Sequence, residues 1–408
     1  MFLLSHLLRR FVRTGPLTVI DAEGTAHRFG GTPGPVAAIR LHDRSLARKL
    51  FFRPEMAVGE AYMDGTLTFE GCTLHDFFHL FGVNRGSLTG YPLQSVLRWL
   101  SRRFRALQQY NPVGQAQKNV AHHYDLSREL YELFLDRDMQ YTCAYYQTPE
   151  DTLEQAQENK KRHVSAKLLL KPGQKVLDMG CGWGGLALHL ATDAGVDVTG
   201  VTLSEEQHRL ASERARSQGL DRRVRFFLKD FREVSEKYDR IVSVGMMEAV
   251  GVRYYGKFFG KIRDLLAEDG VAVIHCIGKM SPPSTAGPWL RKYIFPGAYT
   301  PALSEVLAAV EKQGLWVTDV EVLRLHYAET LREWDRRFQA NRARVAELYD
   351  ERFCRMWEFY LAACEAVFRH GSGMVFQLQL SRRRDTVPLT RDYITADRRA
   401  QGGHRLAS

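Results

Sequence analysis

A glycine-rich turn follows an apolar, strand-like run in KVLDMGCGWGG, residues 175–185. Bare backbone at such a turn lets a ligand approach closely and leaves the N–H groups of the next helix free, which is typical of nucleotide sites. Gly180, Gly182 and Gly185 match the dinucleotide pattern G-x-G-x-x-G. Gly180, Gly182 and Gly184, preceded by Asp178, match instead the turn that is used to bind S-adenosylmethionine. The spacing alone therefore does not decide between the two cofactors.

The residues beyond the turn separate the two cofactors. A dinucleotide site needs an acidic residue about 20 positions past the glycines to bind the ribose hydroxyls. The next strand instead ends in GVTLSEEQ, where Thr202 and Ser204 are the first polar residues. The strand after it ends in Asp230 and Phe231, which suit an adenine by hydrogen bonding and stacking. Asp178 suits a cationic methionyl amine better than a pyrophosphate, so the sequence favours S-adenosylmethionine over NAD.

Strands and helices that could position these side chains alternate from about residue 119 to 320. The apolar runs are KVLDM, VDVTGVTL, VRFFLKD, DRIVSVG and GVAVIHCIG, and the intervening helical segments include SEEQHRLASERARSQ and YYGKFFGKIRDLLAED. This alternation predicts an α/β, Rossmann-like parallel sheet with right-handed crossovers. We expect its ligands beyond the carboxyl ends of the strands.

The chain divides into four predicted regions. Residues 1–105 mix short runs such as LTVIDA and TLTFEG with turn residues, which predicts a smaller N-terminal α+β domain. A polar linker follows at 106–122, the catalytic domain is expected at 123–381, and 382–408 reads as a basic tail. Within the catalytic region, residues 330–370 form an aromatic-rich helical stretch.

Composition narrows the class of protein. The 408 residues are 45% hydrophobic, and no apolar run reaches the roughly 18 residues needed to span a bilayer. The six cysteines lack CxxC spacing, which argues against a metal site or a disulfide framework. We therefore expect a cytoplasmic protein that binds no metal.

The net charge of +10 is concentrated in two amphipathic stretches. Residues 3–13 place Leu3, Leu4, Leu7, Leu8 and Phe11 on one helical face, with Arg9, Arg10 and Arg13 mostly elsewhere, and residues 96–105 repeat the pattern with Arg98, Arg102, Arg103 and Arg105. Both stretches could lie on an anionic membrane surface. Both could equally pack on the core with solvated arginines.

Seven further segments carry a family resemblance. They are FFRPEMAVGEAYMDG, HYDLSRELYELFLDRDMQYTCAYY, VLDMGCGWGGLA, GVTLSEEQ, DRIVSVGMMEAVG, IHCIG and FPGAY. Over about residues 40–380 the chain resembles the cyclopropane-fatty-acyl-phospholipid synthases and the related mycolic acid cyclopropane synthases. The segment MQYTCAYY and the spacing from the glycine turn to VTLSEEQ are more specific than the turn itself.

The resemblance implies methylene transfer from S-adenosylmethionine to the cis double bond of unsaturated acyl chains in membrane phospholipids. An isolated alkene is a weak nucleophile, so catalysis must align it with the donor in a dry pocket. Transfer leaves a carbocation, which closes to a cyclopropane when a base removes a proton. The family also implies peripheral association with the membrane and no nucleic-acid partner, and it leaves a homodimer open.

The base implied by the resemblance is a bicarbonate held by the backbone at Cys143 and by Glu248, His275, Ile277 and Tyr327. His and Tyr can donate hydrogen bonds to an anion, and a carboxylate can accept one from its hydroxyl. Each of these residues could have a structural role instead. Glu248 could cap a helix, and His275 lies in an apolar strand. Cys143 and Tyr327 could contribute only to core packing. Cys364 matches a family cysteine, although no nearby cation favours its thiolate.

The cofactor positions implied by the resemblance surround the glycine turn. Gln207 is expected to take the ribose role left by the missing acidic residue. The full set is Tyr141, Thr142, Asp178, Gly180, Cys181, Gly182, Trp183, Gly184, Thr202, Leu203, Gln207, Asp230 and Phe231.

Three residues depart from the family pattern. Ala249 follows Glu248 where the family usually has His, Met247 stands where an aromatic is common, and Phe376 replaces a frequent Trp. The changes touch the fate of the carbocation, so a C-methyltransferase giving methylene- or methyl-branched chains is the main alternative. A second alternative is a lipid-binding protein whose catalytic domain has lost its activity. The presence of Asp178 and Glu248 argues against it.

Overall fold

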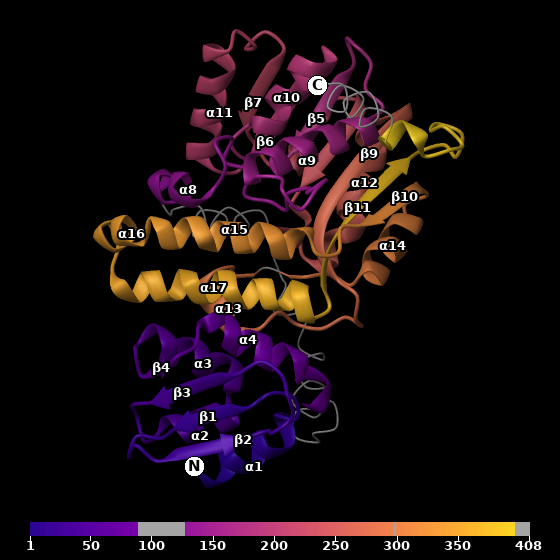
Figure 1. Ribbon diagram of the computed structural model, residues 1–408. Coiled ribbons are helices and arrows are strands. Elements are labelled where there is room, and N and C mark those ends of the chain that lie inside the picture. The colour runs from indigo at the N-terminus through magenta and orange to yellow at the C-terminus, as the bar shows by residue number, and fades with distance from the viewer. Residues whose placement is uncertain (89–126, 298, 396–408) are drawn as a thin grey trace, which may run out of the picture. The chain divides into compact units, whose positions relative to one another are not determined.

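The computed structural model describes residues 1–88, 127–297 and 299–395 (Figure 1). Two compact units divide the chain. The first comprises Met1–Arg105, Ser284–Pro296 and Tyr327–Gly373, and the second comprises Ala106–Pro283, Gly297–His326 and Met374–Ser408. The predicted linker, the arginine-rich stretch 96–105 and residues 396–408 of the basic tail lie outside the described residues, and the predicted domain boundaries stay a prediction.

The second unit is built on a seven-stranded sheet in the order β10-β11-β9-β8-β5-β6-β7 (Figure 1). Parallel pairing joins the predicted strands β5 to β9, which confirms the Rossmann-like sheet. The strands are β5 (Lys175–Met179), β6 (Asp197–Thr202), β7 (Val224–Leu228), β8 (Tyr238–Val244), β9 (Leu266–Lys279), β10 (Trp316–Val322) and β11 (Gly373–Ser381).

Alternate residues of the central strands feed two cores on opposite faces of this sheet. Val176 and Val242 pack with α9, α10 and α11, whereas the neighbouring Leu177 and Ile241 pack with α12 and α14. Because side chains alternate along a strand, strands covered on both faces are apolar at nearly every position. The helices are α8 (Arg128–Phe134), α9 (Leu153–Leu168), α10 (Gly185–Ala194), α11 (Glu205–Ser217), α12 (Tyr255–Leu265) and α14 (Leu303–Glu311).

Two features of the sheet differ from the sequence prediction. The helix expected to run to residue 269 ends at Leu265, because Leu266 is extended and pairs with Tyr238 as the start of β9. The sheet also contains β10 and β11, which pair antiparallel with each other and were not predicted. The sheet is therefore mixed.

The first unit has a four-stranded sheet in the order β2-β1-β3-β4, which confirms the α+β prediction. Helix α17 packs on α3 and α4 of this unit, and the Tyr62 hydroxyl donates a 2.8 Å hydrogen bond to Glu358. The elements are α1 (Phe2–Phe11), β1 (Leu17–Ile20), β2 (Ala26–Phe29), β3 (Ala37–Leu41), α2 (Leu46–Phe52), α3 (Pro54–Met63), β4 (Leu67–Phe69), α4 (Leu74–Val83), α13 (Pro288–Tyr293), α15 (His326–Ala340), α16 (Arg342–Leu348) and α17 (Glu351–His370).

Helix α1 turns most of its apolar face inward. Leu4, Leu8 and Phe11 belong to the core of the first unit, which supports the core interpretation for residues 3–13. Phe2 and Leu3 are the exceptions, with 84% and 44% of their surface exposed. Among the described residues, no helix combines the length and apolarity needed to cross a bilayer.

Candidate active site

A cavity of about 200 Å³ opens at the carboxyl ends of β5, β6, β7 and β8. The segment 139–142 forms another part of its wall. All the cofactor residues predicted from the sequence line this cavity except Gly184. The remaining lining residues, which the sequence reasoning did not name as cofactor residues, are Met139, Gln140, Leu186, Val201, Lys229, Arg232, Val244, Gly245, Met246, Ala249, Val250, Tyr254 and Lys257.

The glycines of the turn serve two different purposes. Gly180 and Gly182 line the cavity with φ of +80° and +53°, a backbone conformation that favours glycine. A Cβ at Gly182 would meet no atom within 4 Å, so a side chain there would project into open space. Gly184 has φ +84°, and its Cβ would lie 2.8 Å from the Phe226 ring. Its need for glycine is therefore one of packing.

Two buried polar atoms at the cavity lack hydrogen-bond partners among the described residues. They are Asp178 Oδ2, an acceptor, and the indole Nε1 of Trp183, a donor. Burial raises the pKa of Asp178 to about 7, while the charge of Lys160 acts in the opposite direction. A ligand that presents a cationic amine would pair with Asp178 and restore its ionised form, which fits S-adenosylmethionine.

Two further pairs of polar residues at the cavity are held by local hydrogen bonds. The Thr202 hydroxyl donates to Gln207 Oε1 at 2.9 Å. Arg232 donates to both carboxylate oxygens of Asp230, with Nε 2.8 Å from Oδ1 and Nη2 2.6 Å from Oδ2. The carboxylate predicted to bind adenine is thus already paired with an arginine.

His275 of β9, which pairs with Val244 at the end of β8, and the carboxylate of Glu248, which follows β8, are buried at the same end of the sheet. Glu248 Oε1 accepts a 2.5 Å hydrogen bond from the backbone N–H of Ile277, and its Oε2 has no partner within the described part of the chain. Burial raises the pKa of Glu248 to about 7, against the effect of the Ile277 hydrogen bond. Ile277, which the resemblance names as a bicarbonate-binding residue, thus has its backbone N–H engaged by Glu248.

Gln377 on β11, which the sequence reasoning missed, lies against His275. Its side-chain nitrogen is 3.2 Å from His275 Nδ1. Burial, together with the charges of Lys160 and Lys167, lowers the pKa of His275 to about 3, so the ring is neutral. With the amide nitrogen of Gln377 assigned to face it, Nδ1 accepts, and this assignment puts the ring proton on Nε2. That N–H lacks a partner in the described structure. No short motif signals Gln377.

The remaining predicted catalytic residues are distributed over both units. Cys143 is buried in the second unit. Tyr327 and Cys364 belong to the first unit, where the Tyr327 ring makes T-shaped contacts with Trp334 and Phe368. Burial raises the pKa of the Cys364 thiol to about 12, so it stays protonated at neutral pH.

Comparison with known proteins identifies the family. Residues 113–378 match the family described as mycolic acid cyclopropane synthetase. The chain belongs to this family. It is an S-adenosylmethionine-dependent methyltransferase, as the fold and the cavity residues predicted.

Individual relatives match most of the chain. It is 36% identical to the cyclopropane-fatty-acyl-phospholipid synthase of Escherichia coli over 85% of this chain and 88% of the relative. Identity is also 36% to the tuberculostearic acid methyltransferase UfaA1 of Mycobacterium tuberculosis, over 93% and 90%. The structure of mycolic acid cyclopropane synthase CmaA1 with SAH and CTAB covers 66% of this chain and 99% of its own, with a TM-score of 0.63 and 32% identity.

Substituting Gly182 tests whether the cavity holds the cofactor. Gly182→Val should abolish measurable binding of S-adenosylmethionine, because the new side chain would occupy the open space beside the turn. Gly219→Val is the matched control, since Gly219 also has a positive φ, +67°, with no atom within 4 Å of its Cβ, but lies outside the cavity. Calorimetric titration compares them. Equal affinity in the two variants would contradict the assignment.

The affinity for S-adenosylmethionine should depend on the ionisation of Asp178. With its pKa raised to about 7 in the free protein, a bound ammonium lowers that pKa, so binding below pH 7 releases a proton. Affinity should therefore fall as the pH decreases below about 7, by up to about tenfold per unit, and level off above it.

Calorimetry in buffers of different ionisation enthalpy measures both the affinity and the released proton. Titrations below about pH 7.5 avoid most of the titration of the ligand's own amine. Asp178→Asn should bind more weakly and with a flat profile. A parent protein with pH-independent affinity and no proton release would show that Asp178 does not meet the amine.

Proposed function

We propose that the enzyme transfers a methylene group from S-adenosylmethionine to the cis double bond of unsaturated acyl chains in membrane phospholipids, giving cyclopropane rings. The cofactor, when bound, supplies an electrophilic methyl group. The observation that carries the proposal is a buried acceptor, Glu248 Oε2, and a buried donor, His275 Nε2, both unpaired in the described structure. The E. coli relative named for this reaction supports the substrate class.

The residues around the cofactor cavity suit a weak nucleophile. Apolar side chains such as Met139, Leu186 and Met246 line it beside the polar groups that hold the cofactor. Excluding water prevents it from competing with the alkene for the methyl group and from quenching the cation.

Bicarbonate is the base in this proposal. His275 Nε2–H could donate to one of its oxygens, and Glu248 Oε2 could accept from its hydroxyl, so the two unpaired atoms are complementary to this anion. Gln377 keeps the donor proton on Nε2 by occupying Nδ1. In this proposal the backbone at Cys143 completes the anion site, as the resemblance implies, whereas Ile277 contributes by orienting Glu248. The role of Tyr327 stays a prediction from the resemblance.

The alternative is C-methylation of the same acyl chains, giving methylene- or methyl-branched products. Ala249, which stands where the family usually has His, lines the cavity. Phe376 packs against Gly278, one residue from Ile277. UfaA1, named a methyltransferase, is as similar in identity as the E. coli synthase. The cyclopropane, the exocyclic methylene and a methyl-branched alkene all need the same methyl transfer and differ in which proton leaves. A saturated methyl branch would need a separate reductant.

Lipid analysis of a host that expresses the chain tests the reaction. Mass spectrometry should show unsaturated acyl chains heavier by one methylene, and proton NMR should show ring methylene signals. Signals of an exocyclic methylene or a methyl branch instead would establish the alternative. An unchanged lipid profile, with the protein expressed and folded, would contradict both.

Glu248→Gln is the informative variant for the same assay. It preserves volume but replaces an anionic acceptor, so turnover should fall roughly 10- to 100-fold, corresponding to the loss of one charge-assisted hydrogen bond of about 1.5–3 kcal/mol. Affinity for S-adenosylmethionine should stay near that of the parent, because Glu248 does not line the cofactor cavity. Added bicarbonate should rescue turnover only partly. Parent-like turnover would remove Glu248 from the base site.

The substrate places the enzyme at a membrane surface, and we propose a cytoplasmic, peripherally bound protein. On α1, Phe2 and Leu3 are exposed together with Arg9 and Arg10. Co-sedimentation with anionic vesicles should exceed that with zwitterionic vesicles and fall with salt. Arg9→Gln with Arg10→Gln should reduce it, whereas the exposed Arg216→Gln, in the second unit, should not. Equal binding to both vesicle types at low salt would contradict an electrostatic contact.

A further inference from the structure

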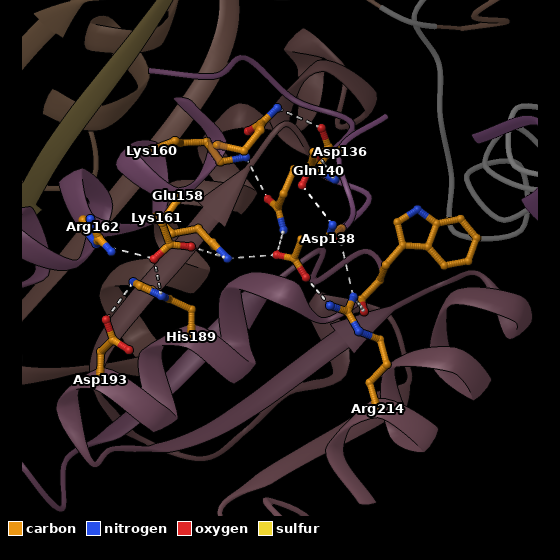
Figure 2. Close-up of polar contacts among 12 residues, drawn as sticks. Asp136, Asp138, Gln140, Glu158, Lys160, Lys161, Arg162, His189, Asp193 and Arg214 are labelled. Atoms are coloured by element: carbon orange, nitrogen blue, oxygen red, sulfur yellow. Dashed lines mark hydrogen bonds and ion pairs between the residues drawn. The ribbon is translucent and has the colours of Figure 1, made fainter. Parts of the chain in front are cut away.

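Two chain segments that are distant in sequence form adjoining parts of the cofactor cavity. One is the stretch 139–142 and the other is the turn 180–183. Four polar residues that do not themselves line the cavity connect the two, namely Asp138, Lys160, Lys161 and Arg214 (Figure 2). The position of one segment relative to the other therefore depends on side chains that a ligand would not touch.

Asp138 is the centre of this group. Its carboxylate forms an ion pair with Arg214 of α11 and another, at 3.1 Å, with Lys161 of α9. It also accepts a 3.0 Å hydrogen bond from the side-chain amide of Gln140, a residue of the cavity wall. In Figure 2 the three donors converge on this one carboxylate.

Arg214 extends the connection to the glycine turn. Its Nη1 donates a 2.9 Å hydrogen bond to the carbonyl oxygen of Trp183. One guanidinium therefore holds both Asp138, next to the stretch 139–142, and the backbone of the turn. The planar fork of arginine suits such a double contact, because its donors are fixed relative to one another.

Lys160 completes the support from the other side. It is buried, and its Nζ donates to Gln140 Oε1 at 2.7 Å and to Thr142 Oγ1 at 2.8 Å. Gln140 thus accepts from Lys160 and donates to Asp138. The stretch 139–142 is fixed at both of these residues by charge-assisted hydrogen bonds.

Gly185, the first residue of α10, leaves the space that the Asp138 carboxylate occupies. A Cβ at Gly185 would overlap both oxygens of Asp138. The carboxylate also lies at the helix N-terminus, where a negative charge is favoured. Burial by itself would raise the pKa of Asp138, yet the charges of Lys161 and Arg214 lower it, so the group is ionised at neutral pH.

We propose that Asp138 is a positioning residue for S-adenosylmethionine, which acts by holding the stretch 139–142 against the glycine turn through Arg214 and Gln140. The inference rests on the cofactor site of the proposed function and adds Asp138, a residue to which the family resemblance assigned no role. This role of Asp138 depends on two features, the ionised carboxylate and the space that Gly185 leaves for it.

Asp138→Ala should raise the dissociation constant of S-adenosylmethionine about tenfold or more, because Arg214 and Gln140 lose a shared acceptor. The KM for S-adenosylmethionine should rise while the KM for dispersed phospholipid stays unchanged. Glu213→Ala is the matched control. It removes a carboxylate that pairs with Arg209 at 2.8 Å on the exposed surface of α11, the helix that also carries Arg214. This control should bind the cofactor like the parent.

Gly185→Ala tests the same geometry without removing any charge. Alanine is compatible with the first turn of a helix, so the variant should fold, but its Cβ would displace the Asp138 carboxylate and weaken cofactor binding. In an Asp138→Ala background the same change should add little. The two effects should therefore be strongly non-additive.

Calorimetry and thermal melting of the four proteins in this cycle decide the question. Parent-like cofactor affinity in both folded single variants, or additive effects, would overturn the proposal. A lowered melting temperature with unchanged affinity would make Asp138 merely structural. If Asp138→Ala does not fold, Gly185→Ala and Arg214→Met supply the same test. A parent that fails to bind S-adenosylmethionine would instead contradict the proposed function itself.

Discussion

The site depends on one constraint: polar atoms are buried without hydrogen-bond partners at the carboxyl edge of the sheet. Asp178, Glu248 and His275 each keep such an atom within the described structure. An unpaired buried group costs about 1–3 kcal/mol, so the surrounding sheet must be stable enough to tolerate several. Ligands that complete these hydrogen bonds recover that energy, and two of the groups, Asp178 and His275, are held on strands that are packed on both faces.

The same burial sets the protonation states that the chemistry needs. In a low-dielectric site neutral forms are favoured, which raises the pKa of Asp178 and Glu248 to about 7 and lowers that of His275 to about 3. His275 is thus neutral, and the ionisation of Asp178 responds to the charge of a cationic ligand. In the proposed mechanism, cofactor binding and base positioning both depend on residues at this edge of the sheet.

Support for the cofactor and control over the product are located in different parts of the unit. The glycine turn and the stretch 139–142 are held by charged residues behind the cavity, centred on Asp138. In the proposed reaction, we expect the residues that decide which proton leaves to lie near Glu248, where Ala249 and Phe376 differ from the pattern that the family resemblance predicts. Substitutions at these positions could alter the product while leaving the cofactor residues unchanged.

The sequence by itself determined the glycine turn and the five parallel strands, because turn chemistry and apolar periodicity are local. Together with the family resemblance it predicted about half of the residues that line the cofactor cavity. Only the tertiary structure revealed β11, since Gln377 and Gln379 look like solvent-facing positions but are fully buried and hydrogen-bonded to His275 and to the Lys167 carbonyl. Only folding joined Arg214 to Asp138, which are 76 positions apart. The apolar side of α1 was visible in the sequence, but whether it met lipid or core was not. Periodicity shows that one face of a helix is buried. Only the packing of the folded chain determines which partner covers that face.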